Sequence, residues 1–205
     1  AKSFNSLSFK IKIIYSYRNQ IDSIKSHYFE LIYQGKKFQD QNGKDQMMYL
    51  GDIDEFFNNH IDSFNNIKRV SPWANVFGKK NITTFLYDKA HFNSNVLKSF
   101  LNIIDPNINI EPSKNKLVHH SLDIKFIKIL KDLDKLEIRF ETRDKIARLL
   151  KEISKGDNKD ILSLELMNKI TATYKDSNKV FLDDFVHDRN QYEIFERYNL
   201  NQPSE

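Results

Sequence analysis

The clearest hydrophobic pattern in the chain is an apolar run followed at once by a helical repeat. The run from Phe9 to Tyr17 is mostly apolar, with β-branched residues at its centre, which predicts a strand buried on both faces. Apolar residues then recur at helical spacing to about Tyr33, and the following Gly35 is a residue type that ends helices. A strand that leads directly into a helix is typical of α/β proteins.

The middle of the chain repeats this order. A helical pattern runs through residues 52–78 and ends at Gly78, and a second strand is predicted from Asn81 to Asp88. An amphipathic helix follows at residues 94–104. The intervening residues 36–46 are polar and contain an Asn-Gly pair, which predicts a loop with a turn.

From Ser121 onward the pattern is helical almost throughout. Three helices are predicted at 121–133, 136–153 and 163–175, followed by a short segment to Tyr198. We therefore expect an α/β fold with a parallel sheet, although two clear strands are few for a stable open sheet. We expect one domain over 1–205, with an α/β part (1–118), a helical extension (119–198) and a flexible tail (199–205).

Composition narrows the class of protein. Hydrophobic residues make up 40% of the 205 residues, charged residues make up 29%, and the formal net charge is +4. These values are typical of a globular protein, and so small a charge is weak evidence for an anionic partner. There are no cysteines, no apolar run of membrane-spanning length and no signal peptide, so we expect a cytoplasmic protein without thiolate metal sites.

One pair of polar residues stands out at the first strand–helix junction. Arg18 follows the predicted strand, and Ser26 lies eight residues later, two turns into the helix. Ligands of open α/β sheets bind beyond the carboxyl ends of the strands, near helix N-termini, and a guanidinium can hold a phosphate with two hydrogen bonds. The pair therefore suggests an anion site. An Arg at a sheet edge and a solvent-facing Ser explain the same spacing equally well.

The stretch IKIIYSYRNQIDSIKSHYFELIYQG resembles the strand and helix that bind the 3′-phosphate of 3′-phosphoadenosine 5′-phosphosulfate (PAPS) in the sulfotransferase family. The likeness continues through IDSFNNIKRVSPWANVFGKKNITTFLYDKAHFNSNVLKSFLNII. The segment KITATYKDSNKVFLDDF resembles the last helix of bacterial sulfotransferase-like proteins of capsule and cell-surface polysaccharide synthesis. The residues that carry the resemblance are Arg18, Ser26, Tyr28, Phe29, Trp73, Asn81, Ile82, Tyr87, Asp88, Phe100 and Leu101.

The resemblance implies a P-loop-kinase-like fold and transfer of a sulfuryl group from PAPS to a saccharide hydroxyl. It implies that Arg18 and Ser26 bind the 3′-phosphate, while Tyr87 either contacts the adenine or packs in the core. Lys36 and Lys37 are candidates for guiding an anionic acceptor. The expected partners are a nucleotide donor and a glycan acceptor, without metal or nucleic acid.

The chain also departs from that family. The Lys- and Gly-rich loop that binds the 5′-phosphosulfate has no counterpart here, because neither QGKK nor FGKK has its spacing or lies between a strand and a helix. No catalytic base is assigned, and a solvated loop pair is the favoured interpretation of His119 and His120. A non-catalytic sulfotransferase-like scaffold is therefore the alternative function. A nucleotide kinase or a glycosyltransferase partner domain is a third possibility.

Overall fold

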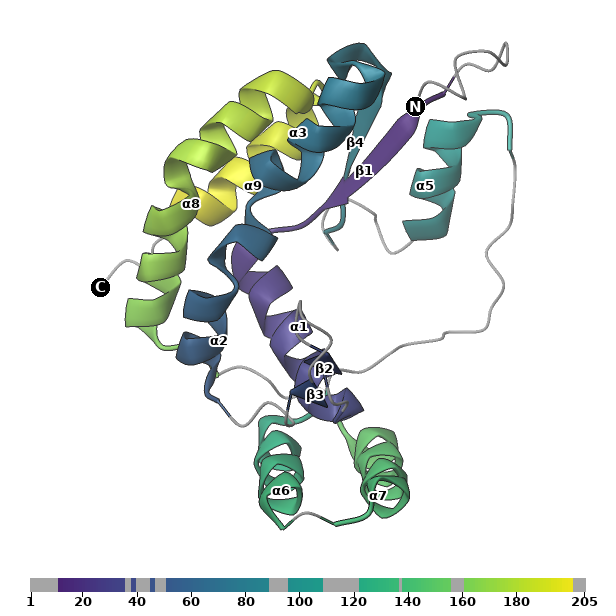
Figure 1. Ribbon diagram of the computed structural model, residues 1–205. Coiled ribbons are helices and arrows are strands. Elements are labelled where there is room, and N and C mark those ends of the chain that lie inside the picture. Colours follow the sequence, from purple (N-terminus) through teal and green to yellow (C-terminus); the bar gives the residue numbers. More distant parts are fainter. Residues whose placement is uncertain are drawn as a thin grey trace. The chain divides into compact units, whose positions relative to one another are not determined.

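The computed structural model describes residues 11–35, 38–39, 45–46, 51–88, 96–108, 122–136, 138–155 and 161–200 (Figure 1). The fold is mixed α/β and mostly helical, with a small parallel sheet of two strands, which confirms the expected class in its coarse form. The chain forms two compact units. The first unit comprises Ala1–Gln20, Ile61–Lys116 and Asn168–Glu205, and the second comprises Ile21–His60 and Leu117–Met167. The single domain expected from the sequence stays a prediction.

The sheet of the first unit joins the two strands that the sequence predicts. β1 (Ile13–Tyr17) pairs in parallel with β4 (Ile82–Leu86), in a register that places Ile13 beside Ile82 and Tyr17 beside Leu86. Both strands are shorter than their apolar patterns. Residues 9 and 10 lie outside the described residues, and Asn81 belongs to the short 3-10 helix η2 (Lys79–Asn81).

Helices cover both faces of this strand pair. Figure 1 shows α3 (Asn66–Phe77), α8 (Leu164–Phe185) and α9 (Arg189–Leu200) on one face and α5 (Val96–Ile104) on the other. Side chains alternate between the faces of a strand, so Tyr15 and Tyr17 point to the same face. There the Tyr17 ring packs against Phe181, with 4.9 Å between ring centroids, while Phe85 meets Phe100 of α5 at 5.9 Å on the opposite face. The core of the unit lies between the strands and α3, α8 and α9.

The second unit is built from helices. Most of α1 (Gln20–Gln34) belongs to it, together with α2 (Ile53–Asn59), α6 (Ile124–Lys135) and α7 (Phe140–Ile153). Two short antiparallel strands, β2 (Phe38–Gln39) and β3 (Asp45–Gln46), flank the Asn-Gly pair. The predicted loop over 36–46 is therefore wrong at these positions, because residues 38–39 and 45–46 pair with each other as strands.

The largest difference from the sequence prediction concerns α8, which ends ten residues beyond the predicted Lys175. Polar residues after Lys175 interrupt the apolar repeat, but Asn178 is buried, and its amide exchanges two hydrogen bonds with the amide of Gln20 (2.6 and 3.1 Å). The helix then continues to Phe185 and adds its last turns to the core. Along the described stretches, we find no helix that is both long and apolar enough to cross a membrane.

Candidate functional site

Arg18 lies at the carboxyl end of β1, as the sequence predicts. Its side chain is partly buried, and α1 begins two residues later at Gln20. The paired amides of Gln20 and Asn178 hold the first residue of α1 against α8. A strand end followed by the positive end of a helix dipole is a favourable environment for an anion.

Tyr87 lies next to Arg18 because the two parallel strands end side by side. The N–H of Tyr87 donates to the carbonyl oxygen of Tyr17 (2.7 Å), which extends the pairing by one step beyond Leu86. The Arg18 guanidinium lies over the Tyr87 ring, 5.8 Å from its centroid, in a cation–π contact. Tyr87 is 46% exposed, so it does not pack in the core. The pair thus presents a positive charge and an aromatic surface at one sheet edge.

A buried carboxylate flanks this pair. Asp88 follows Tyr87 directly and is only 8% exposed. An acidic residue therefore follows Tyr87 directly along the chain, in a buried position.

The other predicted site residues are described only in part or not at all. Ser26 is exposed on α1, within the second unit, whereas Arg18 belongs to the first unit. The pairing of Arg18 with Ser26 stays a prediction, because each is described within its own unit. Lys36, Lys37, His119 and His120 lie outside the described residues.

The glycine of each Gly-Lys sequence directly follows a helix, which confirms that neither sequence follows a strand. Gly35 follows α1 with φ +53°, and Gly78 ends α3 with φ +86°, a backbone conformation that favours glycine. Lys79 forms an ion pair with Asp184 (2.8 Å) and lies over the Phe185 ring. Because a helix C-terminus carries the negative end of the dipole, neither position is suited to a phosphate.

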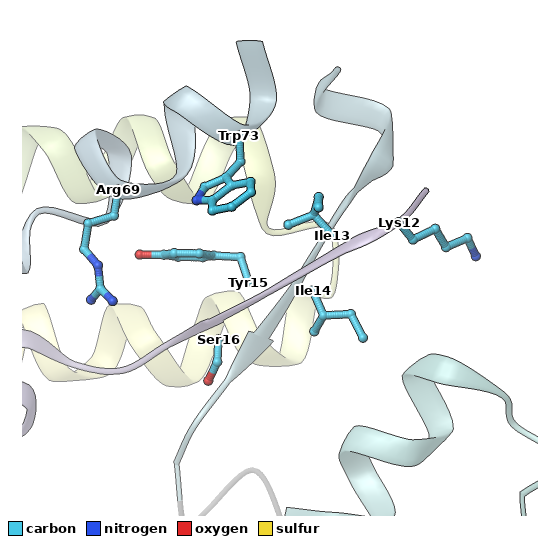
Figure 2. A pocket seen from close by; sticks show the side chains of 7 residues that line it. All are labelled: Lys12, Ile13, Ile14, Tyr15, Ser16, Arg69 and Trp73. Carbon is cyan, nitrogen blue, oxygen red and sulfur yellow. The ribbon is translucent and has the colours of Figure 1, made fainter. Parts of the chain in front are cut away.

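A surface pocket of about 480 Å³ lies beside β1 in the first unit. Figure 2 shows its lining, in which Trp73 stands between Arg69 and Lys12. The described residues that line it are Lys12, Ile13, Ile14, Tyr15, Ser16, Arg69 and Trp73. The Arg69 guanidinium lies 5.9 Å from the centroid of the Tyr15 ring. Among these described residues, the pocket lining combines two cations with two aromatic rings and has no acidic side chain.

Sequence reasoning missed this pocket because a Trp with a Phe four residues later, here Trp73 and Phe77, is typical of core packing. The two rings do stack, with centroids 6.1 Å apart, but Trp73 is 51% exposed. The available signal was the spacing of Arg69 and Trp73, which are four residues apart and therefore share one helix face. That face lies beside the buried positions Val70 and Ala74, which face the core.

Burial also perturbs two groups in the second unit. Burial, and next the negative charge of Asp52, raise the pKa of Tyr28 to about 12. The Tyr28 hydroxyl donates to the carbonyl oxygen of Gly51 (3.1 Å), and Lys131 Nζ donates to the same oxygen (2.8 Å). Burial lowers the pKa of Lys131. These contacts connect α1 and α6 through the Gly51 carbonyl, so we assign them a structural role.

Comparison of the chain with known proteins gives no further information on these residues. A scan against protein-family models and searches of curated proteins and of solved structures found no match to this chain. Within the ranges that the structure describes, no group of three or more His, Cys, Asp or Glu side chains could hold a metal ion. The Arg18–Tyr87 pair and the pocket beside β1 are therefore the two surfaces with the clearest chemical character.

Proposed function

We propose that the protein is a sulfotransferase-like nucleotide-binding protein that takes PAPS as the donor of a sulfuryl group for a saccharide hydroxyl. The observation that carries the proposal is the contact between Arg18 and Tyr87 at the carboxyl ends of two neighbouring parallel strands. The proposal includes the finer fold, a P-loop-kinase-like sulfotransferase fold. The parallel pair, with a helix that follows its first strand directly, supports it.

The chemistry of the pair fits an adenine nucleotide with a 3′-phosphate. The guanidinium has a planar fork of N–H donors that matches two phosphate oxygens, and the contact with Tyr87 restricts its orientation. The exposed part of the Tyr87 ring offers an aromatic surface to the adenine. In this assignment Ser26 adds a hydroxyl to the same phosphate.

In the proposed reaction, the bond between the sulfuryl sulfur and the bridging phosphate oxygen breaks. A new bond joins that sulfur to the oxygen of the acceptor hydroxyl, whose proton passes to a base, and adenosine 3′,5′-bisphosphate leaves. In such a transfer the protein acts mainly by holding both partners in line and stabilising the charge of the moving group. Lys36 and Lys37 are proposed to guide an anionic acceptor.

A second candidate is a scaffold that binds the nucleotide without transferring the group. It is favoured by the position of the two Gly-Lys sequences at helix C-termini, where they are poorly placed to bind a phosphosulfate. Both candidates require the Arg18 site. They differ in whether a sulfuryl group moves.

Calorimetric titration with adenosine 3′,5′-bisphosphate tests the shared site. Loss of charge-assisted hydrogen bonds predicts that Arg18→Ala weakens binding by at least roughly tenfold. We expect a smaller loss for Ser26→Ala. Arg189→Ala is the matched control, because Arg189 is an exposed arginine of the first unit that pairs only with Glu193 in the described contacts, and it should leave the affinity unchanged.

The choice of ligand separates a specific site from general charge attraction. Adenosine 5′-monophosphate and adenosine diphosphate lack the 3′-phosphate and should bind more weakly, and should respond less to Arg18→Ala. Equal affinity for all three nucleotides, or an Arg18→Ala variant that binds as the wild type does, refutes the assignment. Transfer of labelled sulfate from PAPS to a saccharide then separates the enzyme from the scaffold, which binds the nucleotide and transfers nothing.

A further inference from the structure

The two outer edges of the β1–β4 pair differ. The edge of β4 that faces away from β1 is capped by a side chain, because the N–H of Leu86 donates to Oε1 of Gln191 (3.0 Å). Gln191 is itself buried, and its Nε2 donates to Asp188 (3.1 Å). The polar groups of an edge strand need partners of this kind or they attract another strand. The β4 edge is thus closed at Leu86.

The direction of one hydrogen bond shows which main-chain groups of β1 lie on its outer edge, away from β4. The carbonyl oxygen of Tyr17 accepts from the N–H of Tyr87, so the main-chain groups of Tyr17 point toward β4. Successive residues of a strand point their N–H and C=O groups to opposite edges. The main-chain groups of Ile14 and Ser16 therefore point away from β4. No other strand borders that edge within the described part of the chain.

The pocket lies along this edge. Its lining includes Tyr15 from one face of β1 and Ser16 from the other, and no residue of β4. A single pocket that reaches both faces of a strand, and avoids its partner strand, has to follow the strand's open edge. It extends over residues 12–16, a length of about 17 Å for an extended chain.

The side chains around the edge indicate what fits there. Arg69 and Trp73 are one helical turn apart, about 6 Å along α3. Alternate residues of an extended peptide are about 6.6 Å apart on one face, so an acidic residue against Arg69 places an apolar residue against Trp73. Lys12 adds a second cation to the lining, and none of the described lining residues is acidic. A second copy of β1 would bring Lys12 and Arg69 near like charges.

From these observations we infer that the open edge of β1 binds an extended acidic peptide segment as an added strand. The main chain of the segment pairs with Ile14 and Ser16. Its side chains follow the order acidic, any residue, apolar, with the carboxylate on Arg69 and the apolar group on the exposed face of Trp73. This site is separate from the Arg18–Tyr87 pair and does not depend on the proposed function.

The probe is the blocked peptide acetyl-Thr-Glu-Thr-Ile-Thr-Glu-Thr-amide, titrated into the full chain. Its sequence is the same in both directions, so it offers Glu two positions from Ile whichever way the strand runs. Trp73 is the only tryptophan of the chain, so its fluorescence reports directly on this surface. We expect a saturable shift of its emission to shorter wavelength as the Ile side chain covers it.

Two changes test strand pairing itself. Ser16→Pro removes the N–H that points away from β4, while the β1–β4 hydrogen bonds stay intact, and should weaken binding by roughly tenfold. Ser16→Ala keeps that N–H and should bind as the wild type does. A peptide N-methylated on its Glu and Ile residues and one N-methylated on its inner Thr residues block opposite edges of the probe. Only one of the two should lose binding, and this result does not depend on how a variant folds.

Charge is tested separately. Arg69→Gln should weaken binding severalfold, and so should a probe with Gln in place of Glu, whereas Lys175→Gln, an exposed position on α8, should not. The inference is overturned if the Trp73 emission shows no saturable change, if both N-methylated peptides bind equally, or if Ser16→Pro binds normally. It is also overturned if sedimentation shows a dimer that Ser16→Pro dissociates, because a second copy then occupies the edge.

Discussion

Replacing Arg143 by Met removes the central contact of the second unit. Arg143 is 1% exposed, and its Nε and Nη2 donate to the two carboxylate oxygens of Asp134 (2.7 and 3.1 Å). Its Nη1 donates to the carbonyl oxygen of Tyr33 (2.6 Å), and Nη2 also donates to that of Ile32. One guanidinium therefore neutralises a buried carboxylate and satisfies two carbonyls of the last turn of α1.

The expected loss is large because every partner is left behind in the interior. Removing one member of a buried ion pair costs about 3–5 kcal/mol, and buried carbonyls without a donor add to this by about 1–3 kcal/mol each. Arg143→Met should therefore lower the free energy of unfolding by at least about 3 kcal/mol. That is a large fraction of the roughly 5–15 kcal/mol typical of a folded domain.

Urea denaturation followed by circular dichroism measures this loss, with two comparisons. Arg148 lies five residues later on α7 and pairs with Asp144 (2.7 Å) in a largely exposed position, so Arg148→Met should cost less than about 1 kcal/mol. Adding Asp134→Leu to Arg143→Met removes the stranded carboxylate and should recover part of the loss, but not the part due to the two carbonyls. A cost for Arg143→Met equal to that of Arg148→Met, or a double variant no more stable than the single one, refutes the reasoning.

Two further predictions concern the same unit. Gly35→Ala should lower the free energy of unfolding by about 2–4 kcal/mol, because φ is +53° and a Cβ would lie under 3.0 Å from the buried Arg143 guanidinium. In Gly78→Ala the new Cβ would lie no nearer than 3.9 Å to another atom, so only the backbone strain at φ +86° should lower the free energy of unfolding. Equal unfolding midpoints for the Gly35→Ala and Gly78→Ala variants would contradict the steric part of the Gly35 prediction. Tyr28 has its pKa raised from 10.0 to about 12, so its contribution to stability is complete below pH 10 and is lost as pH rises through 12. Urea titrations at pH 9 and pH 12 should show that the free energy of unfolding falls by about 1–2 kcal/mol more in the wild type than in Tyr28→Phe. An equal fall in both proteins would contradict the assignment of this pH dependence to Tyr28.

The sequence predicts best where neighbours in the chain decide the structure. β1 and the helix after it follow from the change of apolar period between Ile13 and Tyr33, and the end of α1 follows from Gly35. The position of Arg18 at a strand end follows from the same boundary. These features depend on local backbone preferences and on which side chains share a face, so a single sequence contains them.

Sequence reasoning was wrong where distant contacts override the local pattern. The apolar repeat predicted a helix that ends at Lys175, although the resemblance of residues 169–185 implied a longer one. Asn178 is buried against Gln20, which is 158 residues away, and α8 continues to Phe185. Trp73 belongs to a residue type that is usually well buried, and it is half exposed because the core side of α3 is occupied by smaller residues. Neither result is visible from the spacing of apolar residues.

By itself, the sequence determined the mixed α/β class and the position of both strands of the parallel pair. It also identified Arg18 and Tyr87 as residues at strand ends. Only the tertiary structure decided that these strands are neighbours and that Arg18 meets Tyr87. It also decided that Gln191 caps the edge of β4 at Leu86, whereas no strand of the described residues borders the outer edge of β1. The reason is physical. Strand and helix formation depend on short-range periodicity, whereas strand order and edge capping depend on contacts between residues far apart in the chain.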